Sequence, residues 1–214
     1  FKQIATVENL LAGWNEFVYD KRGKKDIQIF QLRLMAHILT IYTDLCNKTY
    51  RHGPYQHFKI ADPNPRDIHK ATVCDRLLHH AVYRILYPFF EKRFIADSFS
   101  CRLGKGTHRA LNRFRDFGKR VSFSHTKTCW ILKCDIRKFF ASIDHNILKT
   151  TLSRSVTNHD ILWLIGAIIS SFNSGTEGKG LPLGNLTSQL FVNIYMNEFD
   201  QFVKHKLKVK HYIR

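Results

Sequence analysis

The sequence predicts an α+β fold, in which helices pack with an antiparallel sheet. Long helical segments alternate irregularly with short strand candidates, whereas a parallel sheet requires a regular succession of strands and helices. Hydrophobic residues make up 44% of the 214 residues, which is enough to form a core, as one large domain or two lobes. The sequence contains no internal repeat and no low-complexity linker.

Helices and one hairpin are expected in the first half of the chain. Apolar residues recur at the helical period before Gly53-Pro54, with Thr6 as a candidate N-cap, and again further on. Two short runs on either side of the Pro-rich turn 62–65 indicate a hairpin. The expected elements are helices at 7–19, 27–50 and 75–90, and strands at 57–60 and 67–72.

The second half is expected to alternate between loops, helices and strands. Its strongest strand candidate is the apolar run that ends at Asp135. A glycine- and proline-containing turn, Gly180 to Gly184, precedes its longest helix. The expected elements are a loop at 96–105, a helix at 107–119, a strand at 129–136, helical sequence from 146, a polar loop at 173–179, a helix at 186–204 and a strand at 207–210.

The charge of the chain favours a polyanionic partner. Thirty-four Lys and Arg residues against seventeen Asp and Glu residues give a net charge of +17, which suits nucleic acid or an acidic membrane surface. Between residues 102 and 154 there are thirteen basic residues but only three acidic ones, and aromatic residues lie among them. Such a mixture suits phosphate contacts combined with base stacking, so we expect nucleic acid and not a membrane.

Cysteine and histidine residues indicate neither a disulfide framework nor a zinc site. The five cysteines are odd in number and include no Cys-x-x-Cys pair. His79 and His80 are adjacent but lack partners at ligand spacing. No apolar run approaches the length of about 20 residues that a membrane span needs. We therefore expect a cytoplasmic protein with reduced thiols.

Asp135 is the first candidate for chemistry. It lies near the end of the expected strand, in residues 130–136, where a carboxylate either caps the following helix or holds a metal ion rigidly. Phosphoryl transfer with two Mg²⁺ ions needs such a carboxylate, and the backbone carbonyl of Ile136 could be a second ligand. Phe140, five residues further on, could block a 2′-hydroxyl and so select deoxynucleotides, although ordinary core packing is the alternative.

Two motifs carry a resemblance to a known family. Residues 134–145 read CDIRKFFASIDH and resemble motif A of bacterial reverse transcriptases. Residues 180–189 read GLPLGNLTSQ and resemble motif B, a glycine turn that opens a long helix. The resemblance implies a right-hand polymerase, with fingers at 1–125 and a partial palm at 126–214, in which the helical segment 145–182 returns to the fingers. It also implies Mg²⁺ as cofactor, and template RNA, primer or cDNA, and dNTPs as partners.

The resemblance further assigns roles to single residues. Lys59 and Arg66 flank the hairpin turn, where the fingers of these enzymes present two cations to the incoming triphosphate, although solvated charges are the alternative. Gly184 would allow close backbone approach to the nascent base pair. Arg102 and Lys105 lie in a loop that has the sequence Arg-Pro-Gly-Arg in related enzymes, and they could contact template or primer phosphates.

Motif B departs from the common pattern of the family. Leu183 stands where most reverse transcriptases have Gln, and Gln189 follows Ser188 where they have Pro, so these three positions could affect template or primer binding. This form resembles the enzymes of diversity-generating retroelements, which copy template RNA with errors and are associated with a small basic accessory protein. The alternatives are a group II intron or retron enzyme, and a non-catalytic RNA-binding protein with a polymerase fold.

The resemblance also predicts a segment that the chain does not contain. In the family, the strand resembling 209–214 leads into Tyr-x-Asp-Asp, whose aspartates complete the metal site. One carboxylate cannot hold two Mg²⁺ ions, so the 214-residue chain by itself is expected not to polymerise. Asp144 is expected to cap the helix that begins near Asn146 and not to replace the missing aspartates.

Overall fold

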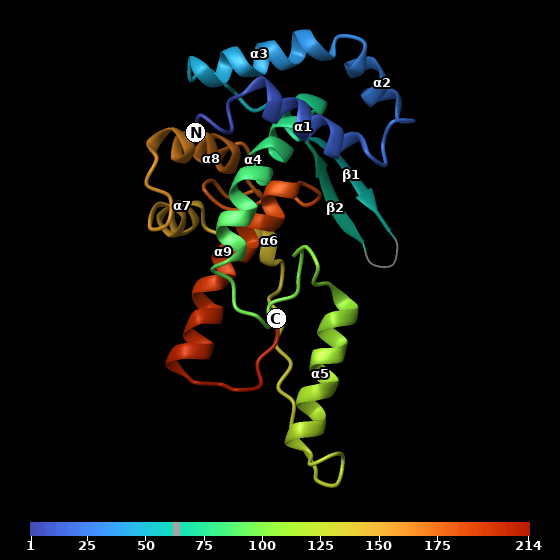
Figure 1. Cartoon of the computed structure of the whole chain (residues 1–214), viewed down its shortest axis with the longest axis vertical. Coiled ribbons are helices and arrows are strands. Elements are labelled where there is room, and N and C mark those ends of the chain that lie inside the picture. The colour runs from blue at the N-terminus through green and yellow to red at the C-terminus, as the bar shows by residue number, and fades with distance from the viewer. Residues whose placement is uncertain (62–64) are drawn as a thin grey trace.

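Thr6 begins the first helix as expected: its hydroxyl oxygen accepts a hydrogen bond from the backbone N–H of Asn9 at 3.0 Å. The computed structural model describes residues 1–61 and 65–214, so part of the expected turn 62–65 lies outside the described residues. Its elements (Figure 1) are α1 (Val7–Val18), α2 (Lys25–Gln31), α3 (Leu34–Cys46), β1 (Gln56–Ile60), β2 (Arg66–Lys70), α4 (Val73–Glu91), α5 (Thr107–Val121), α6 (Phe139–Ser142), α7 (His145–Ser153), α8 (His159–Ser170), α9 (Leu186–Gln201) and a π-helical turn (Phe202–Lys206).

Helix α4 is the centre of the core. It packs against α1, α2 and α3 on one side and against α9 on the other, while α7 packs against both α8 and α9 (Figure 1). The apolar side chains of α4 that its helical period predicts to be inside are fully buried, among them Leu77, Leu78 and Val82. The fold class is therefore confirmed: helices pack with a small antiparallel sheet. No helix of the described residues is long and apolar enough to cross a membrane.

The single helix expected at 27–50 is wrong, because the chain bends at Arg33 (φ −125°, ψ 32°) and forms α2 and α3. The bend brings α2 against α4 while α3 packs on α1. Periodicity could not reveal it, since the buried residues Ile27, Ile38 and Leu45 keep the helical phase across the bend.

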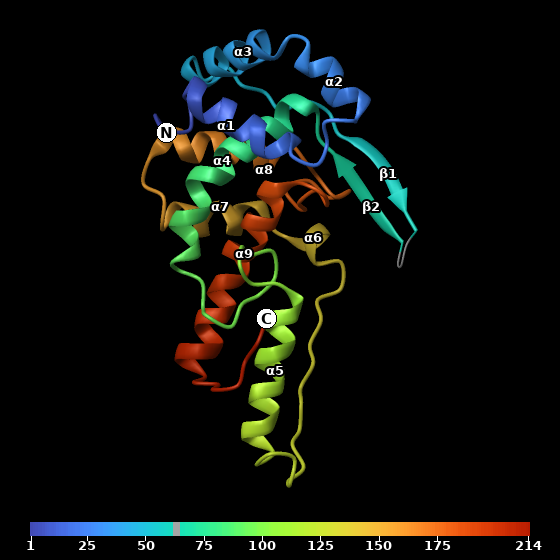
Figure 2. The ribbon, with the colours of Figure 1, turned by 45° about the vertical axis from the view of Figure 1, so that its right-hand side comes forward.

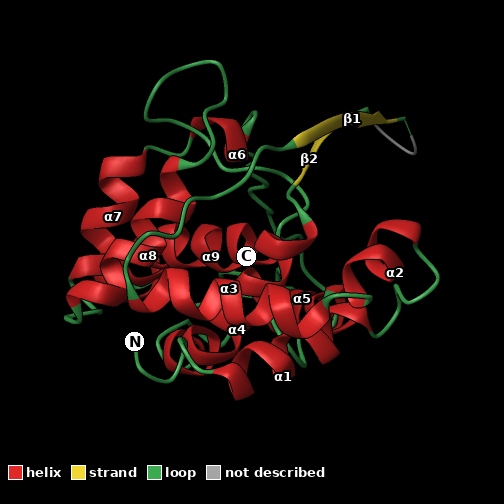
Figure 3. Ribbon diagram, turned by 90° about the horizontal axis from the view of Figure 1, so that it is seen from above, coloured by secondary structure: helices red, strands yellow, loops and turns green. Residues whose placement is uncertain are grey.

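The hairpin forms as predicted and projects from the helical body (Figure 3). Lys59 lies opposite Asp67 and Ile60 lies opposite Arg66. Directly opposite residues share a face of a two-stranded ribbon, and successive residues alternate between faces. One face therefore carries Lys59 and Asp67, and the other carries Arg66 with Ile68.

The strand expected at 129–136 does not form. This segment runs alongside α5 as extended chain (Figure 2), and within the part of the chain that the structure describes its backbone makes no strand pairing. Trp130 is 94% exposed and Leu132 is 89% exposed. A β-strand is stable only beside a partner, and β-propensity alone does not supply one.

The strand expected at 207–210 is also absent. Lys208 has a positive φ of 54°, and the N–H of Val209 donates back to the carbonyl of Val203 at 3.1 Å, which closes a turn. The following residues are held extended instead. Arg214 N–H donates to the carbonyl of Asp97 (3.0 Å), and its carbonyl accepts from Phe99 N–H (2.7 Å).

Candidate functional site

The turn of motif B contacts the main chain of the hairpin. The N–H of His69 in β2 donates to the carbonyl of Leu183 at 3.2 Å. Asn185, the N-cap residue of α9, donates from its side-chain nitrogen to the carbonyl of His69 at 3.4 Å. The hairpin is therefore fixed to the start of α9 at the point where Leu183 and Gly184 lie.

Gly184 is required by its conformation and by its neighbour. Its φ is 102°, in the region that residues with a Cβ avoid. A Cβ at this position would also lie 3.2 Å from the Cγ2 of Ile68 in β2. The glycine thus lets the hairpin approach, and its predicted role beside a nascent base pair is a separate proposal.

Motif A is joined to the same turn. The N–H of Leu181 donates to the carbonyl of Phe140 at 2.8 Å, and the N–H of Gly180 donates to the carbonyl of Ile143 at 2.8 Å. The ring of His145 adds a hydrogen bond to the carbonyl of Gly180 at 2.7 Å. These bonds bring the second half of motif A, the turn of motif B and the hairpin together into one junction.

Phe140 lies at this junction and is half-buried against the core. Its ring contacts that of Phe139 in an edge arrangement with centroids 6.3 Å apart, and Phe139 in turn contacts Tyr195 of α9 at 6.4 Å. Phe139 and Phe140 are both half-buried and both pack against the core, so the packing alternative for Phe140 remains open beside its predicted contact with a sugar.

Asp135 lies on the exposed extended segment and makes no hydrogen bond among the described residues, so it caps no helix. Its carboxylate and the carbonyl of Ile136 are oxygen donors of the kind that Mg²⁺ prefers. However, the described residues contain no group of three His, Cys, Asp or Glu side chains that could hold a metal ion. The donors present fit Mg²⁺ in type but do not form a complete site.

Asp144 is the N-cap of α7. Its Oδ1 accepts from the N–H groups of Asn146 (2.9 Å) and Ile147 (3.1 Å), as the sequence predicts.

The two hairpin cations, Lys59 and Arg66, are exposed and lie on opposite faces of the ribbon. Lys59 lies opposite Asp67, whose pKa is lowered mainly by a 2.9 Å hydrogen bond from His57 and further by the charge of Lys59. Arg66 lies on the face of Ile68, which contacts the Gly184 turn. Only Arg66 therefore shares a face with motif B.

Arg102, which the sequence predicts to contact template or primer phosphates, instead uses its guanidinium group for hydrogen bonds within the protein. Its guanidinium donates from Nε and Nη2 to the carboxylate of Glu91, and from Nη1 to the carbonyls of Ile95 (2.7 Å) and Ser98 (2.8 Å). With every nitrogen used and the side chain 4% exposed, it fixes the loop before α5. Lys105 donates to the carbonyl of Ala96 at 2.8 Å but remains partly accessible.

Ser188 and Gln189, the other two motif B residues predicted to affect template or primer binding, are both at least half-buried. Ser188 is buried and Gln189 is half-buried in the first turn of α9. Next to them, the side-chain oxygen of Asn185 is buried without a hydrogen-bond partner among the described residues. The structure thus does not bring Ser188 to the surface on which a template or primer would lie.

Sequence reasoning missed a buried ionic network at the far end of α9. Asp200 is fully buried and accepts from Arg214 Nε at 2.9 Å to both oxygens and from the Tyr212 hydroxyl at 2.7 Å. Arg214 also donates to Asn193 (3.1 Å) and Ser98 (3.0 Å). The only sequence signal was a carboxylate between two phenylalanines, at positions 199 and 202, near the end of an apolar helix.

A second buried carboxylate, Asp75, lies in the first turn of α4 and binds the chain segments on either side of the hairpin. It accepts from the Tyr50 hydroxyl (2.7 Å), the Gly53 N–H (3.1 Å) and the Thr72 hydroxyl (2.5 Å). The network fixes the chain just before the hairpin, so it positions the hairpin without lying in the junction.

The family profile described as "Reverse transcriptase (RNA-dependent DNA polymerase)" matches residues 61–213, which include β2 of the hairpin, motif A and motif B. The chain therefore belongs to the reverse transcriptase family.

Curated relatives and solved structures agree with this family. The chain is 22% identical to Protein YkfC of Escherichia coli (strain K12) over 83% of its own length and 48% of that protein. It is 28% identical to the group II intron-encoded protein LtrA of Lactococcus lactis subsp. cremoris over 81% of its own length and 29% of that protein. It thus spans less than half of these relatives. Its fold is similar to that of a chain in a partial Cas6-RT-Cas1–Cas2 complex, with a TM-score of 0.59 and 17% identity, covering 94% of this chain and 34% of that one.

Proposed function

We propose that the chain forms the fingers and part of the palm of an enzyme that copies a template RNA into cDNA. In this reaction the 3′-hydroxyl of a primer attacks the α-phosphate of a deoxynucleotide, an O–P bond forms and pyrophosphate leaves. The observation that carries the proposal is the junction: the main-chain hydrogen bonds from Leu181 N–H to the carbonyl of Phe140 and from His69 N–H to the carbonyl of Leu183 join motif A, motif B and the hairpin.

Each group of the junction has a proposed task. Arg66 binds the triphosphate from the hairpin face that contacts motif B, and Lys59 binds it from the other face. Phe140 contacts the sugar, Gly184 the nascent base pair, and Asp135 is a Mg²⁺ ligand whose companions lie outside the described residues.

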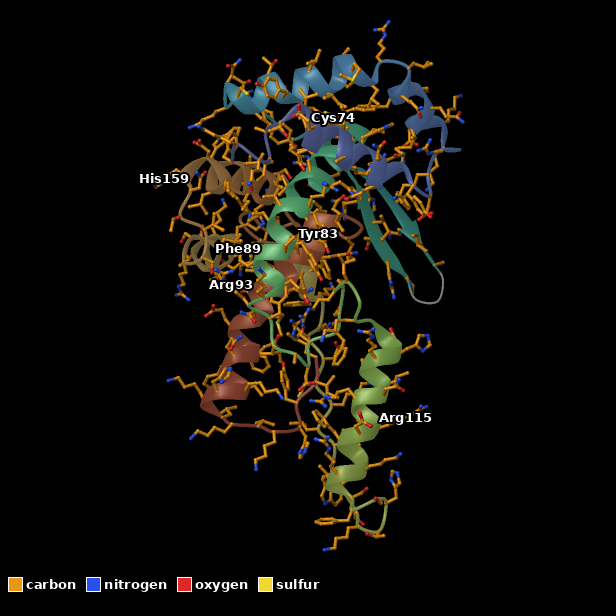
Figure 4. The ribbon with its side chains drawn as sticks, viewed as in Figure 1. Cys74, Tyr83, Phe89, Arg93, Arg115 and His159 are labelled. Carbon is orange, nitrogen blue, oxygen red and sulfur yellow. The ribbon has the colours of Figure 1, made fainter. Side chains whose placement is uncertain are left out.

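Helix α5 and the loop before it are proposed to contact template and primer phosphates. The basic side chains of α5 are mostly exposed, and Arg115 points away from the body of the protein (Figure 4). Lys105 and Arg109 extend this positive surface towards the junction. Because such contacts release counterions, binding of an RNA–DNA hybrid should weaken steeply with salt.

The departures in motif B favour an enzyme of the diversity-generating retroelement type, with its small basic accessory protein as a partner. Leu183 presents an apolar side chain, half-buried, where a Gln amide could contact the base pair. A group II intron enzyme is the second candidate, because the similar protein LtrA is named as intron-encoded. The misincorporation rate of this protein on an RNA template, measured beside that of a group II intron enzyme, separates these candidates. A clearly higher rate favours the diversity-generating type.

The experiment that tests the polymerase proposal is primer extension on an RNA template with the protein from its complete gene. Asp135→Asn should abolish extension, because the amide loses the charge that binds Mg²⁺, and should leave thermal unfolding unchanged, because Asp135 bonds no other described residue. The matched control is Asp144→Asn, which should keep its cap on α7 and full activity. Extension by Asp135→Asn close to that of the wild type would overturn the proposal.

A further inference from the structure

A shallow pocket of about 330 Å³ lies between helix α5 and the loop that precedes it. Ala96 and Phe99 line it from the loop. Four residues of α5, at spacings of three, one and three, line its other wall: Arg109, Asn112, Arg113 and Asp116. Residues at such spacings share one face of a helix, whereas Arg115, which is not among them, points away from the body of the protein (Figure 4). This face of α5 is therefore turned towards the loop.

Ion pairs fix the two walls of the pocket to each other. Arg113 donates from Nε to Oδ1 of the buried Asp97 at 2.7 Å, and Lys204 donates from Nζ to Oδ2 of the same carboxylate at 3.1 Å. Arg102 holds the loop through the carbonyl of Ser98 at 2.8 Å. The pocket is therefore formed before any ligand binds, which lowers the entropic cost of binding.

Three of the lining side chains are left free by these contacts. Arg109, Asn112 and Asp116 are exposed, and none of them makes a side-chain hydrogen bond or an ion pair with any residue that the structure describes. Asp116 is the single acidic residue of α5, beside five Lys and Arg residues. Because an unpaired carboxylate repels phosphate, its position in the pocket indicates a ligand that also presents hydrogen-bond donors.

The free groups are ordered along the helix. Arg109 lies near the N-terminal end of α5, with its Nη1 3.9 Å from the place that a Cβ of Gly104 would take. The N-cap residue Gly106 offers no side chain to the first N–H groups, so this end of the helix suits a phosphate. Asp116 lies seven residues further on, about 10.5 Å along the axis. This is about the length of a nucleotide from its phosphate to the far edge of its base.

The pair Asn112 and Asp116 selects the base. The two residues are one turn apart, so their side chains are neighbours on the helix. The amide of Asn112 can donate one hydrogen bond, and the carboxylate of Asp116 can accept two. Guanine presents the matching order on its Watson–Crick edge, namely the acceptor O6 followed by the donors N1–H and N2–H₂. Adenine, cytosine and uracil lack two adjacent donors, and the edge is accessible only in an unpaired base.

We propose that this pocket binds one unpaired guanosine nucleotide, with its phosphate on Arg109 and its base on Asn112 and Asp116. No lining residue belongs to the junction of motif A, motif B and the hairpin, so the pocket is a separate binding site. The proposal rests on the proposed function only for the source of the nucleotide, which is the template RNA before it is copied. A guanine held on α5 sets the position of the template relative to the junction.

Fluorescence anisotropy with labelled RNA pentanucleotides tests the base preference. The protein from its complete gene should bind UUGUU roughly five- to 150-fold more tightly than UUAUU, the discrimination that one bidentate base contact provides. UUIUU, in which inosine lacks the N2 amine, should bind with an affinity between these two. Asp116→Asn should bind UUGUU and UUAUU equally, because an amide has one acceptor oxygen in place of two. Equal affinities in the wild type, or a guanine preference that persists in Asp116→Asn, would overturn the proposal.

Asp20→Asn is the matched control, since Asp20 is exposed and lies outside the pocket. Both Asp→Asn variants lose one negative charge and should bind every oligonucleotide somewhat more tightly, but only Asp116→Asn should change the ratio of the two affinities. A guanine preference lost equally in Asp20→Asn would show that net charge sets the preference, and the pocket proposal would be wrong. Asp135→Asn should keep the preference whether or not it extends a primer, so this test is independent of the polymerase proposal.

Discussion

The backbone N–H of His69 donates to the backbone carbonyl of Leu183 at 3.2 Å, and this bond joins the β1–β2 hairpin to motif B. Because both groups belong to the main chain, the contact survives most substitutions of either side chain. Changes in this region should therefore affect what the junction recognises more than whether it forms.

Gly184→Ala should lower the free energy of unfolding by about 1–2 kcal/mol, the usual cost of holding a residue with a Cβ in the left-handed region. The new Cβ would also press on Ile68 at 3.2 Å. Chemical unfolding of Gly184→Ala, Ile68→Ala and the double variant separates the two causes. A steric contribution appears as a double variant more stable than additivity predicts. Wild-type stability of Gly184→Ala would contradict both causes.

Leu183→Gln should lower misincorporation, most clearly opposite template adenine, since the amide can hold the base pair through polar contacts that Leu lacks. One well-placed base contact discriminates by about 1–3 kcal/mol, or roughly five- to 150-fold in relative rate. Single-nucleotide insertion kinetics measure this, with Leu183→Met as an apolar control. The alternative is that Leu183 only packs beneath the hairpin. An unchanged error ratio in a stably folded Leu183→Gln protein would favour that alternative.

Arg66→Gln should raise the KM for deoxynucleotides by about tenfold, the effect of losing one charge-assisted hydrogen bond. Lys59→Gln should raise the KM less, because Lys59 is paired with Asp67 on the ribbon face away from Ile68 and Gly184. Steady-state kinetics on both variants provide the comparison. A larger increase in KM for Lys59→Gln than for Arg66→Gln would contradict the proposal that the nucleotide binds on the ribbon face that contacts motif B.

His79→Phe should make the fold more resistant to acid. The imidazole of His79 is buried without a hydrogen-bond partner among the described residues, and burial lowers its pKa to about 3, with a smaller contribution from His52. Between about pH 6.5 and pH 3, His79 is therefore protonated in the unfolded chain but not in the folded chain. The free energy of unfolding consequently falls as the pH drops through this range. At pH 5 the loss is about 2 kcal/mol from this residue.

Urea unfolding of the wild type and His79→Phe at pH 7.5 and pH 5 measures the effect. His80, whose pKa burial lowers to about 4, should retain its own contribution in both proteins, and at pH 5 this contribution is about as large as that of His79. Equal acid sensitivity of the two proteins would exclude His79 as the cause.

Local features of the fold were predictable from sequence, whereas pairings were not. Thr6 and Asp144 cap their helices as predicted, because capping depends on residues only a few positions apart. The strand at 129–136 was wrong, because its residues have β-propensity but the described chain offers no partner. The buried pair Asp200 and Arg214 was missed because neither residue alone reveals its partner.

The candidate site shows the same division. Sequence placed Phe140 and Gly184 in motifs that the structure brings to one junction. It could not show that Lys59 and Arg66 lie on opposite faces of the ribbon, which depends on the pairing register. Nor could the sequence show that Arg102 is buried in an ion pair with Glu91, because a sequence does not distinguish a buried arginine from an exposed one.

The exposure of Trp130 makes the motif A segment visible to spectroscopy. Of the three tryptophans, Trp14 is 3% exposed and Trp163 is partly buried, whereas Trp130 is 94% exposed and only five residues from Asp135. Its indole emission should therefore be at the long wavelength of a ring in water. Any strand, nucleic acid or protein that covers this segment should shift that emission to the blue, so the native chain carries its own fluorescent reporter of what covers the motif A segment.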